Sequence, residues 1–470
     1  MAIKQIINYN SNAKYFAGFL QTIIDESEIK ASVSQDDTKI ELLLDDSDEK
    51  ALATFSKNTT KYLPHSIFID DIKSSSEAID VIKSEFKSPS YNISLCPKCL
   101  SKITDPSSQN YLDDSIKCTH YTNIDSKEFF DNTIFSPNYS DGDTLLVVDS
   151  QSVNNLFLMT EDEVKTLFSI EKPILKVTIK DEELKEITSK KFLSIKSPYN
   201  SRSTLVALNA KESEVPYLFF KAQRELKAVV IKKDVNIIKD DLGLTKQLKE
   251  QNADKIINRF LNIKNEAGYT EAIGTSFSLE NGLSFLVSNE MDTKKVITLQ
   301  EFILSEVLDL MQEDGIKQKL LQNFEKTYPE IFQELKENSE YNFFEALSCI
   351  LELDNKSFES LSDKSLEFHG NGGLKIDTNF TDEGFDYGSF LGSVMSFKLA
   401  GVDEHYLAYS IFEAFGDMAI TTLNQLKTKF KIDKFIMMGS MFENSVLHSR
   451  IITKFQLSNP YFSKAFALDD

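Results

Sequence analysis

The stretch "FIMMGSMFENSVLHSRI", residues 435–451, decides how the second half of the chain folds. Its first residues are apolar and predict a short buried strand, and the pattern after the glycine predicts a helix. Gly439, Ser440 and Asn444 lie where the strand would turn into the helix. Backbone amides at such a turn can bind an anion. The same pattern is typical of an ordinary strand-to-helix connection, and the residues leave both interpretations open.

Outward from this stretch, long helical patterns dominate residues 245–430, and "LKAVVIKKDVNII" at 226–238 predicts a β-hairpin ahead of them. Residues 140–224 combine one predicted helix, "TEDEVKTLF", with short predicted strands. These strands are "DTLLVVDS" at 143–150, "KPILKVTI" at 172–179 and "STLVALNA" at 203–210. The patterns therefore predict mixed helix and strand structure throughout this region.

The N-terminal region alternates between the two periodicities. Its predicted elements are the strands "IKQIINYN", "IKASV", "KIELLL" and "HSIFIDDI" (65–72) and the helices "AKYFAGFLQTIIDESE" and "EKALATFSKNTTKYL". Their order, βαββαβ, is that of a ferredoxin-like split βαβ unit. The following segment, 73–90, predicts a linker with a short helix.

Three cysteines follow with the spacing of metal ligands. Cys96 and Cys99 form a CxxC turn, and Cys118 lies further along the chain, two residues before His120. Tetrahedral zinc is commonly held by three cysteines and one histidine. Tyr121 stands where a second CxxC turn would place its last cysteine. A structural zinc site, thiols packed in a small core, and a redox pair all remain open.

Composition limits the class of protein. A chain of 470 residues is too long for one core and predicts two to four domains. Its formal charge of −21 argues against nucleic acid as a partner, because phosphate contacts need a basic face. The sequence contains neither an apolar run long enough to span a bilayer nor a signal-peptide pattern, so we expect no membrane partner and a cytoplasmic location.

Taken in order, these segments resemble the HypF family, the carbamoyltransferases that mature [NiFe] hydrogenases. "CPKC" followed by "CTHY" resembles the first zinc finger of the family, and residues 154–177 resemble the end of its YrdC-like domain. "FHGNGG" at 368–373 resembles the motif "YEGQAA", and 435–451 resembles "SGGVFQNRLL". The last two matches are the most specific.

The resemblance implies an α+β multi-domain fold of four parts. These are a degenerate ferredoxin-like (acylphosphatase-like) domain at 1–88, a zinc-finger segment at 89–135, a YrdC-like α/β remnant at 136–224 and an actin/hexokinase-type, Kae1-like domain at 225–470. The resemblance also implies ATP and carbamoyl phosphate as ligands, and a HypE-like maturation protein or a hydrogenase subunit as partner.

Much of the family's chemistry is missing from this sequence. The turn at 10–14, "NSNAK", has no arginine to grip a phosphate, and the second zinc finger is absent. No two of the five histidines lie three or four residues apart, which excludes the family's metal-binding pair on a helix. The terminal acids Asp469 and Asp470 are expected to be solvated. The nucleotide or anion pocket that could survive comprises His369, Gly370, Asn371, Gly372, Gly439, Ser440, Asn444 and Arg202.

Two functions follow from the resemblance and its gaps. The first is a HypF-like hydrogenase maturation protein, related to carbamoyl transfer, with weak or no catalysis. The second is a non-catalytic pseudoenzyme, a scaffold that binds hydrogenase maturation proteins. Substitution of buried core residues costs stability, whereas polar site residues often oppose stability and can be lost. A preserved core with a degraded site is therefore compatible with both functions. No residue is assigned a catalytic role.

Overall fold

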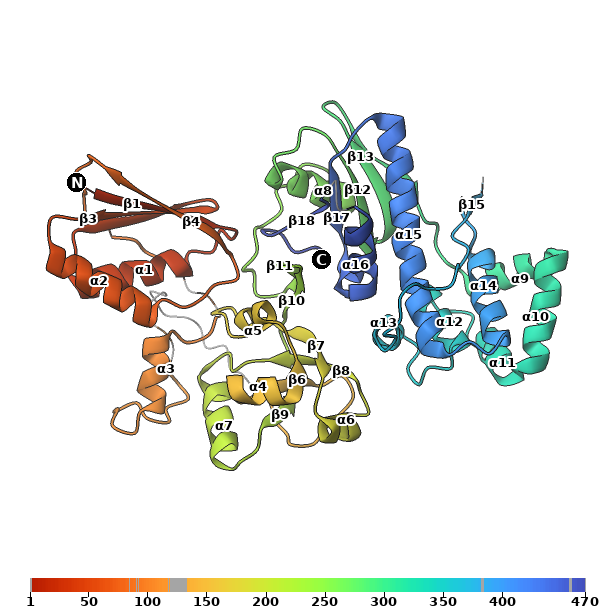
Figure 1. Cartoon of the computed structure of the whole chain (residues 1–470), viewed down its shortest axis with the longest axis horizontal. Coiled ribbons are helices and arrows are strands. Elements are labelled where there is room, and N and C mark those ends of the chain that lie inside the picture. The colour runs from red at the N-terminus through yellow and green to blue at the C-terminus, as the bar shows by residue number, and fades with distance from the viewer. Residues whose placement is uncertain are drawn as a thin grey trace. The chain divides into compact units, whose positions relative to one another are not determined.

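The computed structural model describes residues 2–83, 85–89, 91, 93–116, 118, 133–381, 384–455 and 459–469. The chain forms two compact units. One unit holds the chain up to Gln247 together with Lys464–Leu468, and the other holds Leu248–Ser463 together with Asp469. Figure 1 traces the elements of both. None of the described helices combines the length and apolar character needed to cross a bilayer.

The first unit begins with a four-stranded antiparallel sheet and two helices. The elements are β1 (Ala2–Tyr9), α1 (Tyr15–Ser27), β2 (Ala31–Asp36), β3 (Lys39–Asp45), α2 (Glu49–Tyr62) and β4 (Ile69–Glu77). The strands lie in the order β2-β3-β1-β4, which confirms the predicted βαββαβ arrangement. β4 begins later than predicted, and the described residues between 78 and 90 contain no helix, so the short helix expected there is wrong.

Helix α1 supplies much of the core beneath this sheet. Phe16, Leu20, Ile23 and Ile24 are each at most 2% exposed. Their spacing of three or four residues places them on one side of a helix, where they pack against the inward-facing residues of the strands.

The remainder of the first unit holds a second sheet, with strand order β6-β7-β8-β5-β9. Its elements are β5 (Thr144–Val147), α4 (Ser150–Leu156), β6 (Phe157–Leu158), α5 (Glu161–Leu167), β7 (Leu175–Ile179), α6 (Glu182–Thr188), β8 (Phe192–Lys196), α7 (Ser201–Glu212) and β9 (Tyr217–Phe220). The helix predicted at 160–168 is confirmed as α5, which begins with a capping box on Thr160.

The strand predicted at residues 203–210 is wrong, because these residues lie inside helix α7. Their Thr-Leu-Val run favours a strand. However, Asn200 and Ser203 form a capping box that satisfies the free amides of the first turn. Ala207 and Ala210, three residues apart, are buried on one face of the helix.

The predicted hairpin is confirmed as β10 (Leu226–Ile231) paired with β11 (Asp234–Asp240). It belongs to the first compact unit, although the Kae1-like part was expected to begin at residue 225. The division of the chain into four parts stays a prediction.

The second unit contains a five-stranded sheet with strand order β14-β13-β12-β17-β18. Its strands are β12 (Ala272–Ser278), β13 (Gly282–Ser288), β14 (Thr293–Thr298), β17 (Phe435–Met438) and β18 (Tyr461–Phe462). β17 confirms the strand predicted at the start of 435–451 and pairs in parallel with β12. The first three strands lie in the region where helical patterns were expected to dominate, so that expectation missed an antiparallel meander.

Helices account for most of the rest of this unit. They are α8 (Lys255–Glu266), α9 (Leu304–Glu313), α10 (Gly315–Thr327), α11 (Pro329–Glu337), α12 (Phe343–Ile350), α13 (Phe358–Leu366), α14 (Tyr387–Leu399), α15 (Glu404–Phe430) and α16 (Ser445–Lys454), with a 3₁₀ turn, η1 (Ser440–Glu443), and a small pair, β15 (Phe380–Thr381) and β16 (Gly384–Phe385).

Helices α8 and α15 cover opposite faces of the sheet (Figure 1). On β12, Gly274 faces Phe260 of α8, and Phe277 contacts Phe415 of α15. The two β12 residues are an odd number of positions apart, so they point to opposite sides of the strand.

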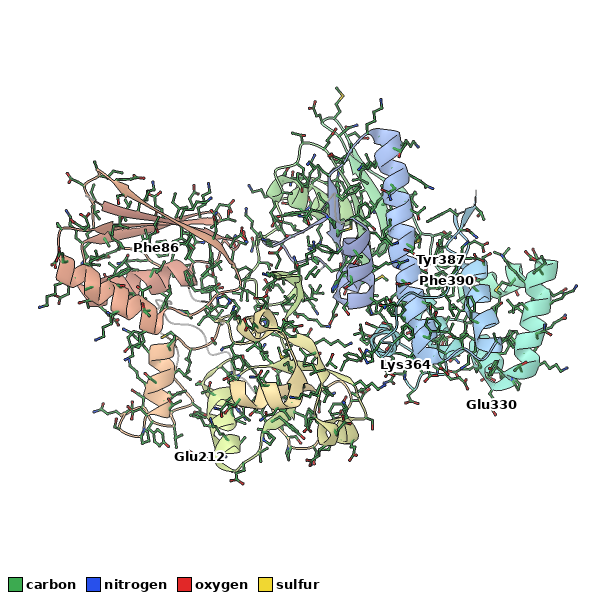
Figure 2. All side chains as sticks on the ribbon, viewed as in Figure 1. Phe86, Glu212, Glu330, Lys364, Tyr387 and Phe390 are labelled. Atoms are coloured by element: carbon green, nitrogen blue, oxygen red, sulfur yellow. The ribbon has the colours of Figure 1, made fainter. Side chains whose placement is uncertain are left out.

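Aromatic side chains of α12, α14 and α15 pack against one another in the second unit. Tyr387 and Phe390 of α14 (Figure 2) have ring centroids 5.0 and 5.1 Å from that of Phe343 on α12. Phe390 also stacks on Phe415 of α15 at 5.4 Å. Such contacts stabilise beyond the area they bury and hold the helices in one arrangement.

Candidate functional site

The Gly439–Ser440 turn is shaped by a close backbone approach. Gly439 has a φ of +113°. A Cβ atom there would lie 2.2 Å from the carbonyl oxygen of Phe277 at the end of β12. Only glycine fits such a position. This glycine is therefore required by the packing of β17 beside β12, whether or not the turn binds a ligand.

The amide of Ser440 is already bound by a carboxylate. Its N–H donates to Asp469 Oδ2 at 2.8 Å, and the Ser278 hydroxyl donates to Asp469 Oδ1 at 2.9 Å. Asp469 is 6% exposed, so the expectation that it is solvated is wrong. At the ends of β12 and β17, these hydrogen bonds compensate for the burial of the carboxylate.

Asn444 is fully occupied by structural hydrogen bonds. Its Oδ1 accepts from Leu447 N as the N-cap of α16, and its Nδ2 donates to Ser362 and Ser365 of α13. It is 1% exposed. In this arrangement its side chain joins two helices and has no donor directed at a ligand.

The loop after α13 places the other predicted pocket residues at the surface. His369, Gly370, Asn371 and Gly372 are all exposed. The backbone that follows is anchored to α15, because the Gly373 amide donates to Glu413 Oε2 at 2.6 Å. These four residues are therefore surface residues, and the predicted pocket stays a prediction.

Glu413 was missed by the sequence analysis although it organises this region. It is 7% exposed and accepts from Gly373 N, the Tyr409 hydroxyl and Arg450 Nη1 of α16. Arg450 also forms a two-pronged pair with Asp417 at 2.7 and 2.8 Å. This pairing raises the pKa of Arg450. A lone glutamate inside a long helical pattern carries no local signal for such a role.

Arg202, the remaining predicted anion contact, is exposed in the first turn of α7. It belongs to the first compact unit, whereas the Gly439–Ser440 turn belongs to the second.

The turn between β1 and α1 is also filled by protein groups. Asn10 N donates to Phe68 O at 2.7 Å, Ala13 N to Ser11 Oγ at 3.0 Å, and Lys14 N to the Tyr91 hydroxyl at 2.9 Å. Ser11 is fully buried. A turn grips an anion through free amides. Here these three amides point at acceptors of the chain itself.

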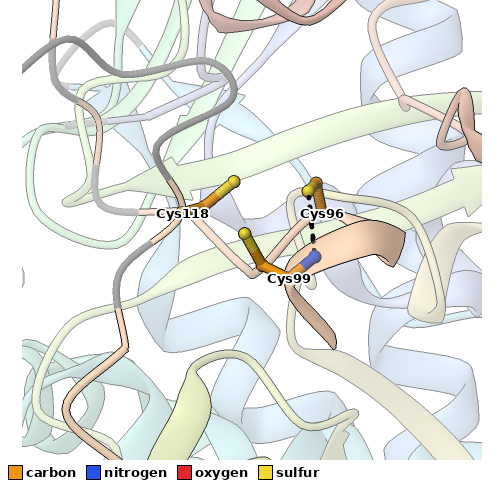
Figure 3. Close-up of side chains that lie close together, drawn as sticks. All are labelled: Cys96, Cys99 and Cys118. Atoms are coloured by element: carbon orange, nitrogen blue, oxygen red, sulfur yellow. Dashed lines mark hydrogen bonds between the residues drawn. The ribbon is translucent and has the colours of Figure 1, made fainter. Parts of the chain in front are cut away.

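The three clustered cysteines meet as predicted (Figure 3). Their Sγ atoms lie within 4.8 Å of one another, and all three side chains are buried. The Cys99 amide donates to Cys96 Sγ at 3.4 Å, and Pro97 begins helix α3 (Pro97–Thr104). Hydrogen bonding to Cys118 and Cys99, together with burial, raises the pKa of Cys96. These effects therefore favour the neutral thiol at Cys96 in the absence of a metal, and a bound cation would stabilise the deprotonated form that ligates it.

The donor set fits a metal ion that prefers sulfur ligands. Two ligands about 2.3 Å from a tetrahedral zinc lie roughly 3.8 Å apart, so a small closure of the cluster would complete three positions. Among the described residues, the acidic, histidine and cysteine side chains that could hold a metal together form one cluster, that of the three cysteines. His120, the predicted fourth ligand, lies outside the described residues, as does Tyr121.

Comparison with known proteins places this geometry in context. No family model matches the chain. Over 161 residues, 31% of this chain, it is 24% identical to Protein HydE of Wolinella succinogenes. The match spans 30% of the length of that relative.

Two solved structures match the fold along the whole chain. Full-length HypF, crystallised in a phosphate- and nucleotide-bound form, matches with a TM-score of 0.62 and 13% identity, covering 100% of this chain and 96% of that one. HypF from T. kodakarensis matches with a TM-score of 0.61 and 11% identity over the same shares. The chain therefore has a divergent HypF-like fold, and the predicted α+β multi-domain class is confirmed.

Proposed function

We propose that this chain serves hydrogenase maturation as a HypF-fold binding protein rather than as a carbamoyltransferase. The fold similarity along the whole chain supports the link to HypF. One observation supports the proposed absence of catalysis. In both turns that would bind an anionic ligand, main-chain amides already donate to acceptors of the chain itself.

Charge supports the same proposal. Carbamoyl phosphate and ATP carry several negative charges, and burying them needs cations or charge-assisted hydrogen bonds. At the Gly439–Ser440 turn the Ser440 amide is bound by the carboxylate of Asp469, which would repel a phosphate. At the other turn, Lys14 is exposed, and residues 10–14 contain no arginine.

The cysteine cluster is proposed to hold a structural zinc ion. The ligands would be Cys96, Cys99 and Cys118. His120, which follows Cys118 closely in the sequence, would be the fourth. All four are borne by the protein, so the site leaves no open position for catalysis. Zinc bound there would fix helix α3, whose Lys98 pairs with Glu26 of α1 and lies 4.6 Å from the Tyr62 ring of α2.

Metal analysis tests the zinc proposal. We expect one zinc per chain in the purified protein and none in Cys118→Ser. Cys349→Ser is the matched control, because Cys349 is a buried cysteine that does not belong to the cluster, and its loss should leave the zinc content unchanged. Equal zinc in wild type and Cys118→Ser would refute the assignment.

The proposed partner is a HypE-like maturation protein or a hydrogenase subunit. With a formal charge of −21, the chain favours a basic surface on that partner. Association should then weaken as salt rises. Capture of the tagged full-length chain from its native cells should recover such a protein at low salt. Recovery of no maturation protein and no hydrogenase subunit would contradict the proposal.

Calorimetric titration tests the absence of catalysis. ATP and carbamoyl phosphate are titrated separately into the full-length chain, and pyrophosphate release is followed with both present. We expect neither binding heat nor pyrophosphate. The HypF crystallised with phosphate and nucleotide is the positive control. Turnover by this chain would support instead a divergent carbamoyl-handling enzyme.

A further inference from the structure

Asp469 lies where donors from three parts of the second unit converge. Ser440 N, after β17, donates to Oδ2, and Ser278 Oγ, at the end of β12, donates to Oδ1. Asn281, in the turn between β12 and β13, places Nδ2 at 3.5 Å from Oδ1. The carboxylate is thus held by main-chain and side-chain donors at once.

We propose that Asp469 is a built-in anion that keeps the Gly439–Ser440 turn closed to phosphoryl ligands. The turn is then a masked oxyanion site, blocked by an autoinhibitory contact from the C-terminal segment. This inference rests on the proposed function, in which the wild-type chain binds no phosphoryl ligand.

The three donors suit an oxyanion. Each is neutral, so the carboxylate supplies the negative charge that they share. Ser278 is 2% exposed, and a buried donor left without an acceptor costs about 1–3 kcal/mol. If Asp469 were removed, a small anion that accepts from the same donors would recover that loss. Inorganic phosphate carries several acceptor oxygens and can take this place.

The turn keeps its shape independently of Asp469. Ser440 Oγ accepts from Leu279 N at 3.1 Å, and Gly439 lies against the backbone of Phe277. These contacts hold the Ser440 amide at the end of β12. The donors are therefore positioned before any anion arrives, which lowers the cost of binding.

A covalently attached carboxylate outcompetes a free anion. A group on a short tether has an effective concentration on the order of mM at its site, so free phosphate must exceed that level to displace it. In wild type, phosphate at lower concentration should have no effect. Without the side chain, the competition disappears.

The test uses the full-length Asp469→Ala variant. Thermal unfolding is followed over a range of inorganic phosphate concentrations, with chloride keeping the ionic strength constant. We expect phosphate to raise the unfolding temperature of the variant, with apparent affinity at least about tenfold higher than for wild type. An equal response of both proteins, or no response of the variant, would overturn the proposal.

Matched variants distinguish the loss of the Asp469 hydrogen bonds from the general effect of removing a negative charge. Asp470→Ala removes the same charge one residue further along and should behave like wild type. Adding Ser278→Ala to Asp469→Ala should abolish the phosphate response, because it removes one of the donors. If Asp469→Ala does not fold, Asp469→Ser replaces it in the same test. Failure here leaves partner capture and the ATP titration of wild type unaffected, so the two proposals fail separately.

Discussion

At the scale of single residues, some buried charged side chains are stabilised by several hydrogen-bond donors of the chain itself. Glu171 is the clearest case in the first unit. It is 2% exposed and accepts from the Tyr15 hydroxyl at 2.7 Å, from Ser66 Oγ and from Ile67 N at 3.0 Å. Burial, followed by the charge of Glu171, raises the pKa of Tyr15 well above its usual value, so the phenol stays protonated and donates.

Replacing Glu171 should destabilise the first unit. Glu171→Ala leaves three donors without their acceptor, and we expect a loss of about 2–4 kcal/mol in the free energy of unfolding. Urea denaturation measures it. Glu182→Ala is the matched control, because the Glu182 side chain is 81% exposed and should change stability little. Similar losses in both variants would show that the buried network is not the cause.

Because His448 on α16 is buried, we expect the stability of the second unit to depend on pH. His448 is 7% exposed, with Nδ1 3.0 Å from Phe442 O, and burial lowers its pKa. The unfolded chain therefore takes up the proton first as pH falls. Its contribution to stability is complete above about pH 6.5 and is lost as pH falls from there toward the folded pKa.

Thermal unfolding at several pH values between neutral and mildly acidic checks this expectation. His448→Gln keeps a donor for Phe442 and should flatten the pH dependence of the second unit. Burial also lowers the pKa of His65 in the first unit, so that unit should keep its own dependence. An unchanged slope in His448→Gln would exclude His448 as the cause.

At the scale of elements, the end of β17 depends on a glycine. Gly439→Ala would place a methyl group against the backbone of Phe277 at a φ of +113°. Neither strand can withdraw easily, because both lie inside the sheet. We expect a loss of about 3 kcal/mol or more.

Gly282→Ala is the matched control for this element. Gly282 has a φ of +75°, but nothing lies within 4 Å of its added Cβ. Its substitution adds backbone strain without a clash, and should cost about 1 kcal/mol. Urea denaturation compares the two variants. Equal losses would mean that conformation alone, and not the close approach, requires glycine at 439.

At the scale of the whole molecule, the chain consists of two compact units with separate cores. Units with their own cores can unfold as separate cooperative steps. We expect scanning calorimetry of the full chain to resolve two transitions. Glu171→Ala should lower the temperature of one, and Gly439→Ala the other. A single transition that both variants shift would contradict this expectation.

Sequence patterns predicted the elements well where periodicity was clear. The βαββαβ order, helix α5, the β10–β11 hairpin and strand β17 are all confirmed. The errors arose where local propensity conflicted with another signal. Residues 203–210 read as a strand because of their Thr-Leu-Val run, but the capping box at Asn200 and the buried alanines belong to a helix. The strands between residues 272 and 298 were not predicted, because helical patterns dominate the surrounding sequence.

The sequence by itself determined the class of fold, the cysteine cluster and the missing cations, because periodicity, ligand spacing and residue type are all local properties. Only the tertiary structure decided what occupies the turns. Asp469 binds Ser440, and the Tyr91 hydroxyl binds the Lys14 amide, across long separations in the chain. Such pairs form because tertiary packing brings distant parts of the chain within hydrogen-bond distance, and the buried Asp469 would be costly to leave without donors. No local pattern encodes that choice.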